Sequence, residues 1–110
     1  MGSEKLEKVI KICKKSYSKA DYNYHILQVV KYALILADKL KADKEIVETS
    51  AYLHDIGRAI KRQDFTKENE HHITGAQEAR KILLDLNYDE EFIKKVELCI
   101  LTHRGRRELS

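Results

Sequence analysis

A histidine and an aspartate stand next to each other at the end of an apolar run, in the stretch Tyr-Leu-His-Asp-Ile-Gly-Arg at positions 52–58. Imidazole nitrogen and carboxylate oxygen form a ligand pair suited to Fe, Mn, Co, Ni or Zn. Adjacent side chains on a helix point about 100° apart, so His54 and Asp55 can bind one ion only where the helix ends. Gly57 fits such an end, because glycine is the usual residue just past a helix C-terminus. A buried Asp–His hydrogen bond is the structural alternative for this pair.

Composition indicates one globular, all-helical domain. The 110 residues are 43% hydrophobic and 35% charged, with no proline and only four glycines, so few residues interrupt helices. The net charge of +3, with both signs interspersed, argues against nucleic acid as a partner and does not repel an anionic substrate. No run has membrane-spanning length and no signal peptide is visible. Cys13 and Cys99 form no CxxC motif, so we expect reduced thiols in a cytoplasmic protein.

Apolar residues recur at helical spacing in five segments. The segment from a cap at Asp43 to Gly57 is apolar on much of its surface, which predicts a helix at the centre of a bundle. The other predicted helices cover residues 4–15, residues from a cap at Ser18 or Asp21 to Leu40, residues from 71 to a left-handed stop at Asn87, and residues from a cap at Asp89 to Gly105. In the second of these, the predicted buried stripe includes Leu36 and Leu40.

The five histidines all fall at predicted helix ends: His25, His54, His71, His72 and His103. In an antiparallel bundle with short connections, starts of even helices and ends of odd helices gather at one pole. We therefore expect all five near Asp55, where neutral imidazoles and a carboxylate in a half-buried pocket need a cation. For His25 alone, a partly buried ring bonded to a backbone carbonyl is the simpler interpretation.

These residues resemble the HD superfamily of metal-dependent phosphohydrolases, in its HDIG subgroup. The order, spacing and helix placement of the motifs agree over about residues 20–105, so the match is specific for the superfamily and unspecific for the substrate. The positions that carry it are His25, the run 54–58, His71 with Gly75 and Ala76, and Ile100 with His103. The resemblance implies a compact bundle of about five helices forming a single HD domain over residues 1–110.

The resemblance also implies roles for individual residues. Metal ligation is implied for His25, His54 and Asp55, and a second ion in some members is held at the positions of His71 and His103, with Asp55 bridging the ions and taking part in catalysis. By its spacing to Gly75, His71 fits a ligand position better than His72. The substrate-binding candidates are Arg58, Lys61 and His72. The expected cofactor is one or two divalent ions among Mn, Fe, Co, Ni, Zn and Mg.

The expected activity is hydrolysis of a nucleotide or another phosphate ester by metal-activated water. A small phosphorylated substrate is the expected partner, and a homo-oligomer is open. Three other interpretations remain: a non-catalytic module that binds metal or nucleotide, a di-iron oxidase or oxygenase, and a structural bundle with incidental histidines.

One departure from the family pattern concerns the last metal ligand. The family supplies an aspartate from a helix beyond the one that ends at His103, whereas this sequence has no aspartate after Asp89 and stops at Ser110. We therefore expect the domain to lack its C-terminal helix or helices. Apolar surface left uncovered by that loss predicts marginal stability or self-association.

Overall fold

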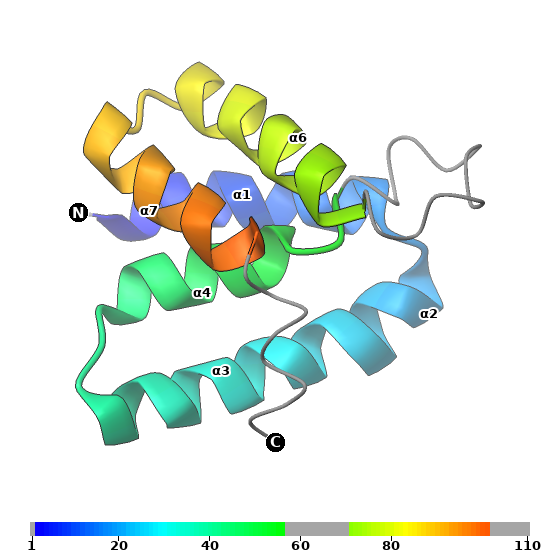
Figure 1. The fold of residues 1–110 in the computed structure, drawn as a ribbon. Helices are drawn as coiled ribbons and strands as arrows, with labels where there is room; N and C mark the ends of the chain where they lie inside the picture. The colour runs from blue at the N-terminus through cyan, green and yellow to red at the C-terminus, as the bar shows by residue number, and fades with distance from the viewer. Residues whose placement is uncertain (1, 57–70, 102–110) are drawn as a thin grey trace.

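Regular structure is helical throughout residues 2–56 and 71–101, the parts of the chain that the computed structural model describes (Figure 1). Lys19–Asp21, Tyr22–Ile26 and Leu27–Leu40 follow one another without a break, so they form the second of five helices in the described part of the chain. The predicted all-α fold is confirmed. None of the described helices is long and apolar enough to cross a membrane. The elements are α1 (Gly2–Ser16), α2 (Lys19–Asp21), the π-helical segment η1 (Tyr22–Ile26), α3 (Leu27–Leu40), α4 (Lys44–Leu53), α6 (His71–Asp85) and α7 (Glu90–Leu101).

Local side-chain caps define where these helices begin and end. The Ser18 hydroxyl accepts from the backbone N–H of Asp21 at 3.0 Å, so Ser18 is the cap of the second helix. Asp43 caps α4 through two backbone N–H groups, and Asp89 caps α7 by accepting from Phe92 at 2.8 Å. Asn87 has a left-handed backbone with φ of 68°, as predicted for the residue that ends α6.

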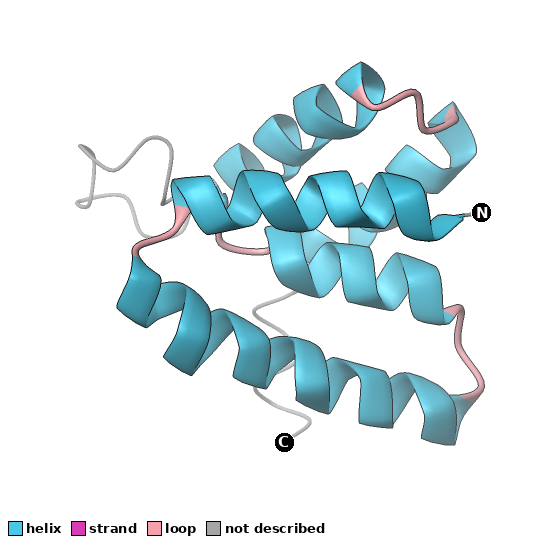
Figure 2. Cartoon of the chain, turned by 180° about the vertical axis from the view of Figure 1, so that it is seen from behind, coloured by secondary structure: helices cyan, strands magenta, loops and turns pink. Residues whose placement is uncertain are grey.

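Helix α4 lies at the centre of the bundle. It packs against α3, α7 and α1. In Figure 1 it runs between α3 and the antiparallel pair α6–α7, and Figure 2 shows α1 lying alongside it in the view from behind. Six of its ten residues are buried, which accounts for its broad face of small and apolar side chains: Ile46, Thr49, Ser50, Ala51, Tyr52 and Leu53. The predicted central position of this helix is confirmed.

The C-terminal end of α4 differs from the prediction. The helix stops at Leu53, and His54 and Asp55 form a turn, whereas the sequence pattern predicted one helix to Gly57. Apolar periodicity continues across this turn because Leu53 and Ile56 are both fully buried. The periodicity therefore reports burial and does not detect the break.

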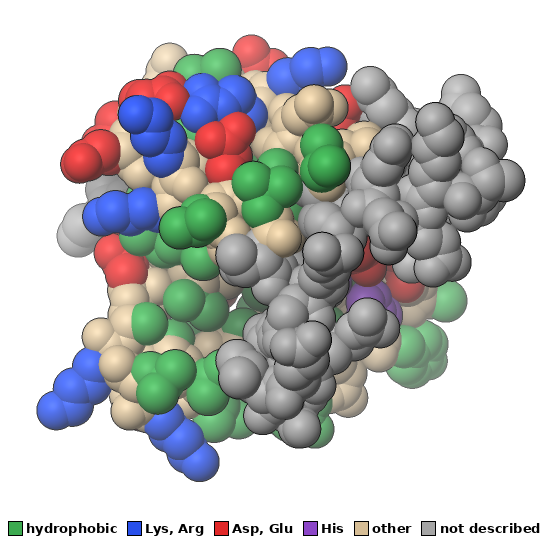
Figure 3. Space-filling model, viewed as in Figure 1, with side chains coloured by type: hydrophobic (Ala, Val, Ile, Leu, Met, Phe, Trp, Pro, Cys, Tyr) green, Lys and Arg blue, Asp and Glu red, His purple; other side chains and the backbone are tan. Residues whose placement is uncertain are grey.

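One flank of α3 carries exposed apolar side chains. The predicted burial of Leu36 and Leu40 is wrong, since they are 43% and 69% exposed. Helix α4 covers the flank of α3 that carries Val30, Ala33 and Ala37, and this leaves the neighbouring flank open. In the view of Figure 1, hydrophobic side chains are visible on the surface over α3, α4 and α7 (Figure 3).

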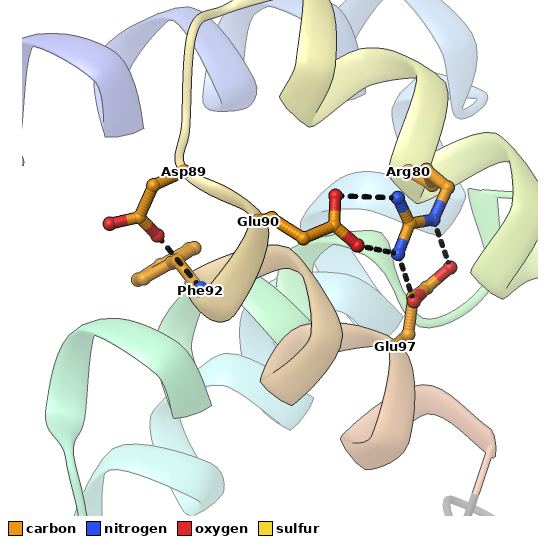
Figure 4. Close-up of polar contacts among 5 residues, drawn as sticks. All are labelled: Arg80, Asp89, Glu90, Phe92 and Glu97. Carbon is orange, nitrogen blue, oxygen red and sulfur yellow. Dashed lines mark hydrogen bonds and ion pairs between the residues drawn. The ribbon is translucent and has the colours of Figure 1, made fainter.

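An arginine clamps α6 to α7 (Figure 4). The Arg80 guanidinium donates to both carboxylate oxygens of Glu97, at 2.6 and 2.8 Å, and to both oxygens of Glu90, at 2.9 and 2.7 Å. Such bidentate pairs combine charge with fixed geometry. The hydrogen bonds from Arg80 lower the pKa of Glu90 below its ordinary value of 4.5. The clamp fixes the relative placement of the helix that begins at His71 and the helix that leads towards His103.

Adjacent leucines on α6 provide a test of the core. Leu83 is fully buried and Leu84 is 50% exposed, so the same substitution removes core packing at one position only. We expect Leu83→Ala to lower the free energy of unfolding by about 2–5 kcal/mol and Leu84→Ala to change it by less than about 0.5 kcal/mol. Urea denaturation followed by circular dichroism measures both, and equal losses would contradict this packing.

The Arg80 clamp predicts a pH-dependent contribution to stability. Because the folded-state pKa of Glu90 is depressed, the contribution is present above 4.5 and is lost as the pH falls through the lower folded-state value. We expect Arg80→Met to lower the urea midpoint at pH 7 and to match the wild type in acid, where Glu90 is protonated in both states. Lys44→Met, which removes an exposed pair with Asp38 at 3.4 Å, is the control and should have little effect. A difference between Arg80→Met and wild type that persists unchanged in acid would refute the clamp.

Candidate metal centre

The π-helical segment η1 orients His25. Its last hydrogen bond runs from the N–H of Leu27 to the carbonyl of Tyr22, five residues back, so one more residue is held in the turn than in an α-helix. Tyr22 and Ile26 are buried and anchor the segment in the core. His25 lies between them with its side chain 49% exposed. The segment thus places the half-exposed imidazole of His25 at the edge of the core.

His54 is held in place by a hydrogen bond to the backbone of its own helix. Its side chain is only 3% exposed, and Nδ1 lies 2.6 Å from the carbonyl oxygen of Ala51. A carbonyl oxygen only accepts hydrogen bonds, so Nδ1 carries the proton of this hydrogen bond. In the neutral ring the lone pair is then on Nε2, the nitrogen that a metal or a proton would take. The hydrogen bond to Ala51 therefore sets both the orientation of the ring and its tautomer.

Asp55 joins the two histidines. Its Oδ2 lies 3.3 Å from Nε2 of His25 and 3.3 Å from Nε2 of His54. The ring centroids of His25 and His54 are 5.5 Å apart, with the ring planes tilted by 56°. The Asp55 side chain is 19% exposed, which makes its desolvation costly unless positive charge lies nearby. Two ring nitrogens facing one carboxylate oxygen are satisfied by a cation or by protons on the rings.

The three residues suit a divalent transition metal. One ligand atom from each of His25, His54 and Asp55 lies within 4.8 Å of the others. Zinc binds histidine nitrogen and carboxylate oxygen at about 2.0–2.2 Å, which in a tetrahedral site separates neighbouring ligand atoms by about 3.3–3.6 Å. The two 3.3 Å distances to Asp55 fall in that range. Among the side chains that the structure describes, which exclude those of His71 and His72, this is the one group of three or more His, Cys, Asp or Glu residues that could hold a metal ion.

The structure brings together three of the five predicted metal ligands. His71 and His72 open α6, but their side chains lie outside what the structure describes. Arg58, Lys61 and His103 lie outside the described residues as well. In Figure 1 the start of the second helix, the end of α4 and the start of α6 all lie towards the same side of the molecule, as the antiparallel arrangement predicted.

Two residues near this centre were not recognised as functional candidates in the sequence. The Tyr17 hydroxyl donates to the carbonyl of Tyr52 at 2.8 Å, and the Cys13 thiol lies 3.4 Å from the same oxygen. The sequence analysis had no role for Tyr17. Cys13 was expected to be a small core residue, and it is fully buried. Their spacing of four residues, which places them on one face of a helix, was the available indication.

Comparison with known proteins gives a family and several relatives. The model of the HD domain matches residues 22–110. An uncharacterized protein of Clostridium beijerinckii is 33% identical over 107 residues, which is 96% of this chain and 62% of that protein. Ribonuclease Y of Mycoplasma capricolum is 36% identical over 84 residues, which is 76% of this chain and 14% of that protein. Ribonuclease Y of Mycoplasma mycoides is 37% identical over 73 residues, 66% of this chain and 16% of that protein.

The chain thus spans less than two thirds of the length of these relatives. No solved structure matches it. The family model nevertheless covers most of the chain, from the first residue of η1 onwards, and includes His25, His54 and Asp55. An all-helical bundle, a His-Asp turn at the end of its central helix and a match over residues 22–110 agree, and the chain belongs to the HD-domain family.

Proposed function

We propose that the protein is a metal-dependent phosphohydrolase that acts on a nucleotide or another small phosphate ester. The HD-domain family is one of metal-dependent phosphohydrolases, and it implies phosphorylated substrates. The observation that carries the proposal for this chain is the convergence of the His25 and His54 rings on Asp55 Oδ2, each at 3.3 Å.

His25, His54 and Asp55 are the proposed ligands of one divalent ion. When bound, the ion supplies Lewis acidity towards water and a phosphoryl oxygen. The buried His54 ring is fixed through Ala51, whereas the half-exposed His25 ring is free to adjust and complete the ligand set. Asp55 is assigned to catalysis because its oxygen already lies between the two rings. Mn, Fe, Co, Ni, Zn and Mg all remain candidates, since imidazole with carboxylate accepts several metals.

The remaining assignments rest on the sequence pattern. His71 and His103 are proposed to hold a second ion, which Asp55 would bridge to the first. Arg58, Lys61 and His72 are proposed to bind the substrate phosphate, for which guanidinium and ammonium groups are the usual partners in proteins. All five lie where the structure describes no side chain.

The cellular setting is also a proposal. Cys13 and Cys99 form no disulfide, which is usual for cysteines in the cytoplasm, and we propose that location. Self-association is supported by the exposed apolar flank of α3, where Leu36 and Leu40 lie.

Replacement of the central carboxylate tests the metal site. Asp55→Asn keeps the shape of the side chain and removes its charge. We expect it to weaken Mn²⁺ or Co²⁺ binding by roughly a hundredfold, because replacing even a residue that only orients a metal ligand costs about ten- to a hundredfold in affinity. Hydrolysis of p-nitrophenyl phosphate and of nucleoside phosphates should fall to background. Asp85→Asn, at the exposed end of α6, is the matched control and should behave as the wild type. Calorimetric metal titration, elemental analysis and phosphate release measure these effects.

Two results would contradict the proposal: a wild type that binds no divalent metal, and an Asp55→Asn variant that remains active in metal-free buffer. Nucleotide binding by calorimetry without turnover would instead favour the non-catalytic module. Visible absorption together with oxygen-dependent turnover would favour a di-iron oxidase or oxygenase.

A second candidate substrate is the phosphodiester backbone of RNA. It is favoured by the similarity to two proteins named Ribonuclease Y, which extends over up to 84 residues of this chain. The net charge of only +3 supplies little attraction for a polyanion, so a small phosphate ester stays the first candidate. Cleavage of a labelled RNA oligonucleotide by the metal-loaded protein, with no release of phosphate from nucleotides, would reverse this order.

A further inference from the structure

We propose that Tyr17 is a positioning residue, whose hydroxyl group holds the turn that directs His54 and Asp55 towards His25. This inference rests on the proposed function, because it takes that turn to be the metal-binding one. Tyr17 precedes the segment that matches the HD domain, residues 22–110, so the support comes from outside the matched region.

The Tyr17 hydroxyl contacts the backbone just before the turn. It donates to the carbonyl oxygen of Tyr52 at 2.8 Å, in the last turn of α4. Burial raises the pKa of Tyr17, and the backbone of Asp55 offsets part of that rise. The hydroxyl therefore holds the backbone two residues before His54, at the point where the helix ends.

The end of α4 needs such a donor because the residues around it are buried. A helix C-terminus leaves four carbonyl groups without a partner in the helix. At this end the carbonyl of Ala51 accepts from the His54 ring at 2.6 Å, and the carbonyl of Tyr52 accepts from Tyr17. Side-chain donors thus take the place of backbone donors, and this supports an end of the helix before His54.

Packing of α1 holds Tyr17 firmly in place. The Tyr17 side chain is 4% exposed, and its backbone N–H donates to the carbonyl of Cys13 at 2.9 Å. The Cys13 thiol is fully buried and lies 3.4 Å from the Tyr52 carbonyl that Tyr17 also contacts. Burial raises the pKa of Cys13 to about 12, so the thiol stays protonated at neutral pH. A protonated thiol and phenol thus act together as donors on one carbonyl oxygen.

The test compares two tyrosines that each lose only a hydroxyl group. Tyr17→Phe removes the hydrogen bond to the Tyr52 carbonyl and keeps the ring. Tyr88→Phe is the control, because Tyr88 is also buried, at 8% exposure, and lies beneath Lys5 at the start of α1. Lys5 is twelve residues before Tyr17, which corresponds to about 18 Å along a helix. The control substitution therefore lies at the other end of α1 from the turn.

Two measurements read out the position of the turn. In metal-free protein, amide hydrogen exchange by NMR at Asp55 should accelerate roughly tenfold or more in Tyr17→Phe, because the local opening of the turn becomes easier. The affinity for Mn²⁺ or Co²⁺, measured by calorimetry well below the melting temperature, should fall roughly tenfold, as for residues that orient a ligand. Tyr88→Phe should change neither quantity.

A lower melting temperature in Tyr17→Phe, with exchange at Asp55 and metal affinity both unchanged, would overturn the proposal, because the hydroxyl would then be merely structural. Faster exchange with wild-type metal affinity would overturn it as well. A wild type that binds no metal would refute the proposed function, and the exchange rate at Asp55 would still decide whether Tyr17 holds the turn.

Discussion

The end of α4 inside the core is the constraint on which the candidate centre depends. A helix that stops in a buried position must find donors for its last carbonyl groups. Here the donors are side chains: the His54 ring for Ala51, and the Tyr17 hydroxyl and Cys13 thiol for Tyr52. The His54 ring that satisfies the Ala51 carbonyl is itself oriented by that hydrogen bond, and Asp55 follows it directly. At this turn, the hydrogen bonds that complete the helix end and the placement of the proposed metal ligands therefore depend on the same residues.

The position of α4 explains how the turn that follows it is held in place by packing. The helix packs against α1, α3 and α7, and six of its residues are buried. Asp55 follows directly and keeps 19% of its side chain exposed, at the border between core and solvent. A carboxylate there is desolvated enough to interact strongly with positive charge, and open enough for a ligand to enter. The half-exposed His25 ring completes the group from η1, on the solvent side.

Much of this arrangement was predictable from local patterns. The caps at Asp43 and Asp89 and the left-handed Asn87 were correct, because capping and left-handed ends depend on residues within a few positions of one another. The exposure of Leu36 and Leu40 was not predictable in this way, since it depends on which flank of α3 its neighbours cover. The Arg80–Glu97 pair joins residues 17 positions apart and required the packing of α6 on α7.

The sequence by itself determined the helical class and the central character of the 44–53 segment, because periodicity, capping and breaker content are local properties. It also placed His25 and His54 near Asp55, as members of a predicted cluster of five histidines, since the order of antiparallel helices places alternate ends together. Only the tertiary structure decided that α4 stops at Leu53, that Tyr17 holds the following turn, and that both ring nitrogens lie 3.3 Å from the same oxygen. The physical reason is that the Tyr17–Tyr52 and His25–Asp55 contacts join residues 35 and 30 positions apart, which no local pattern encodes.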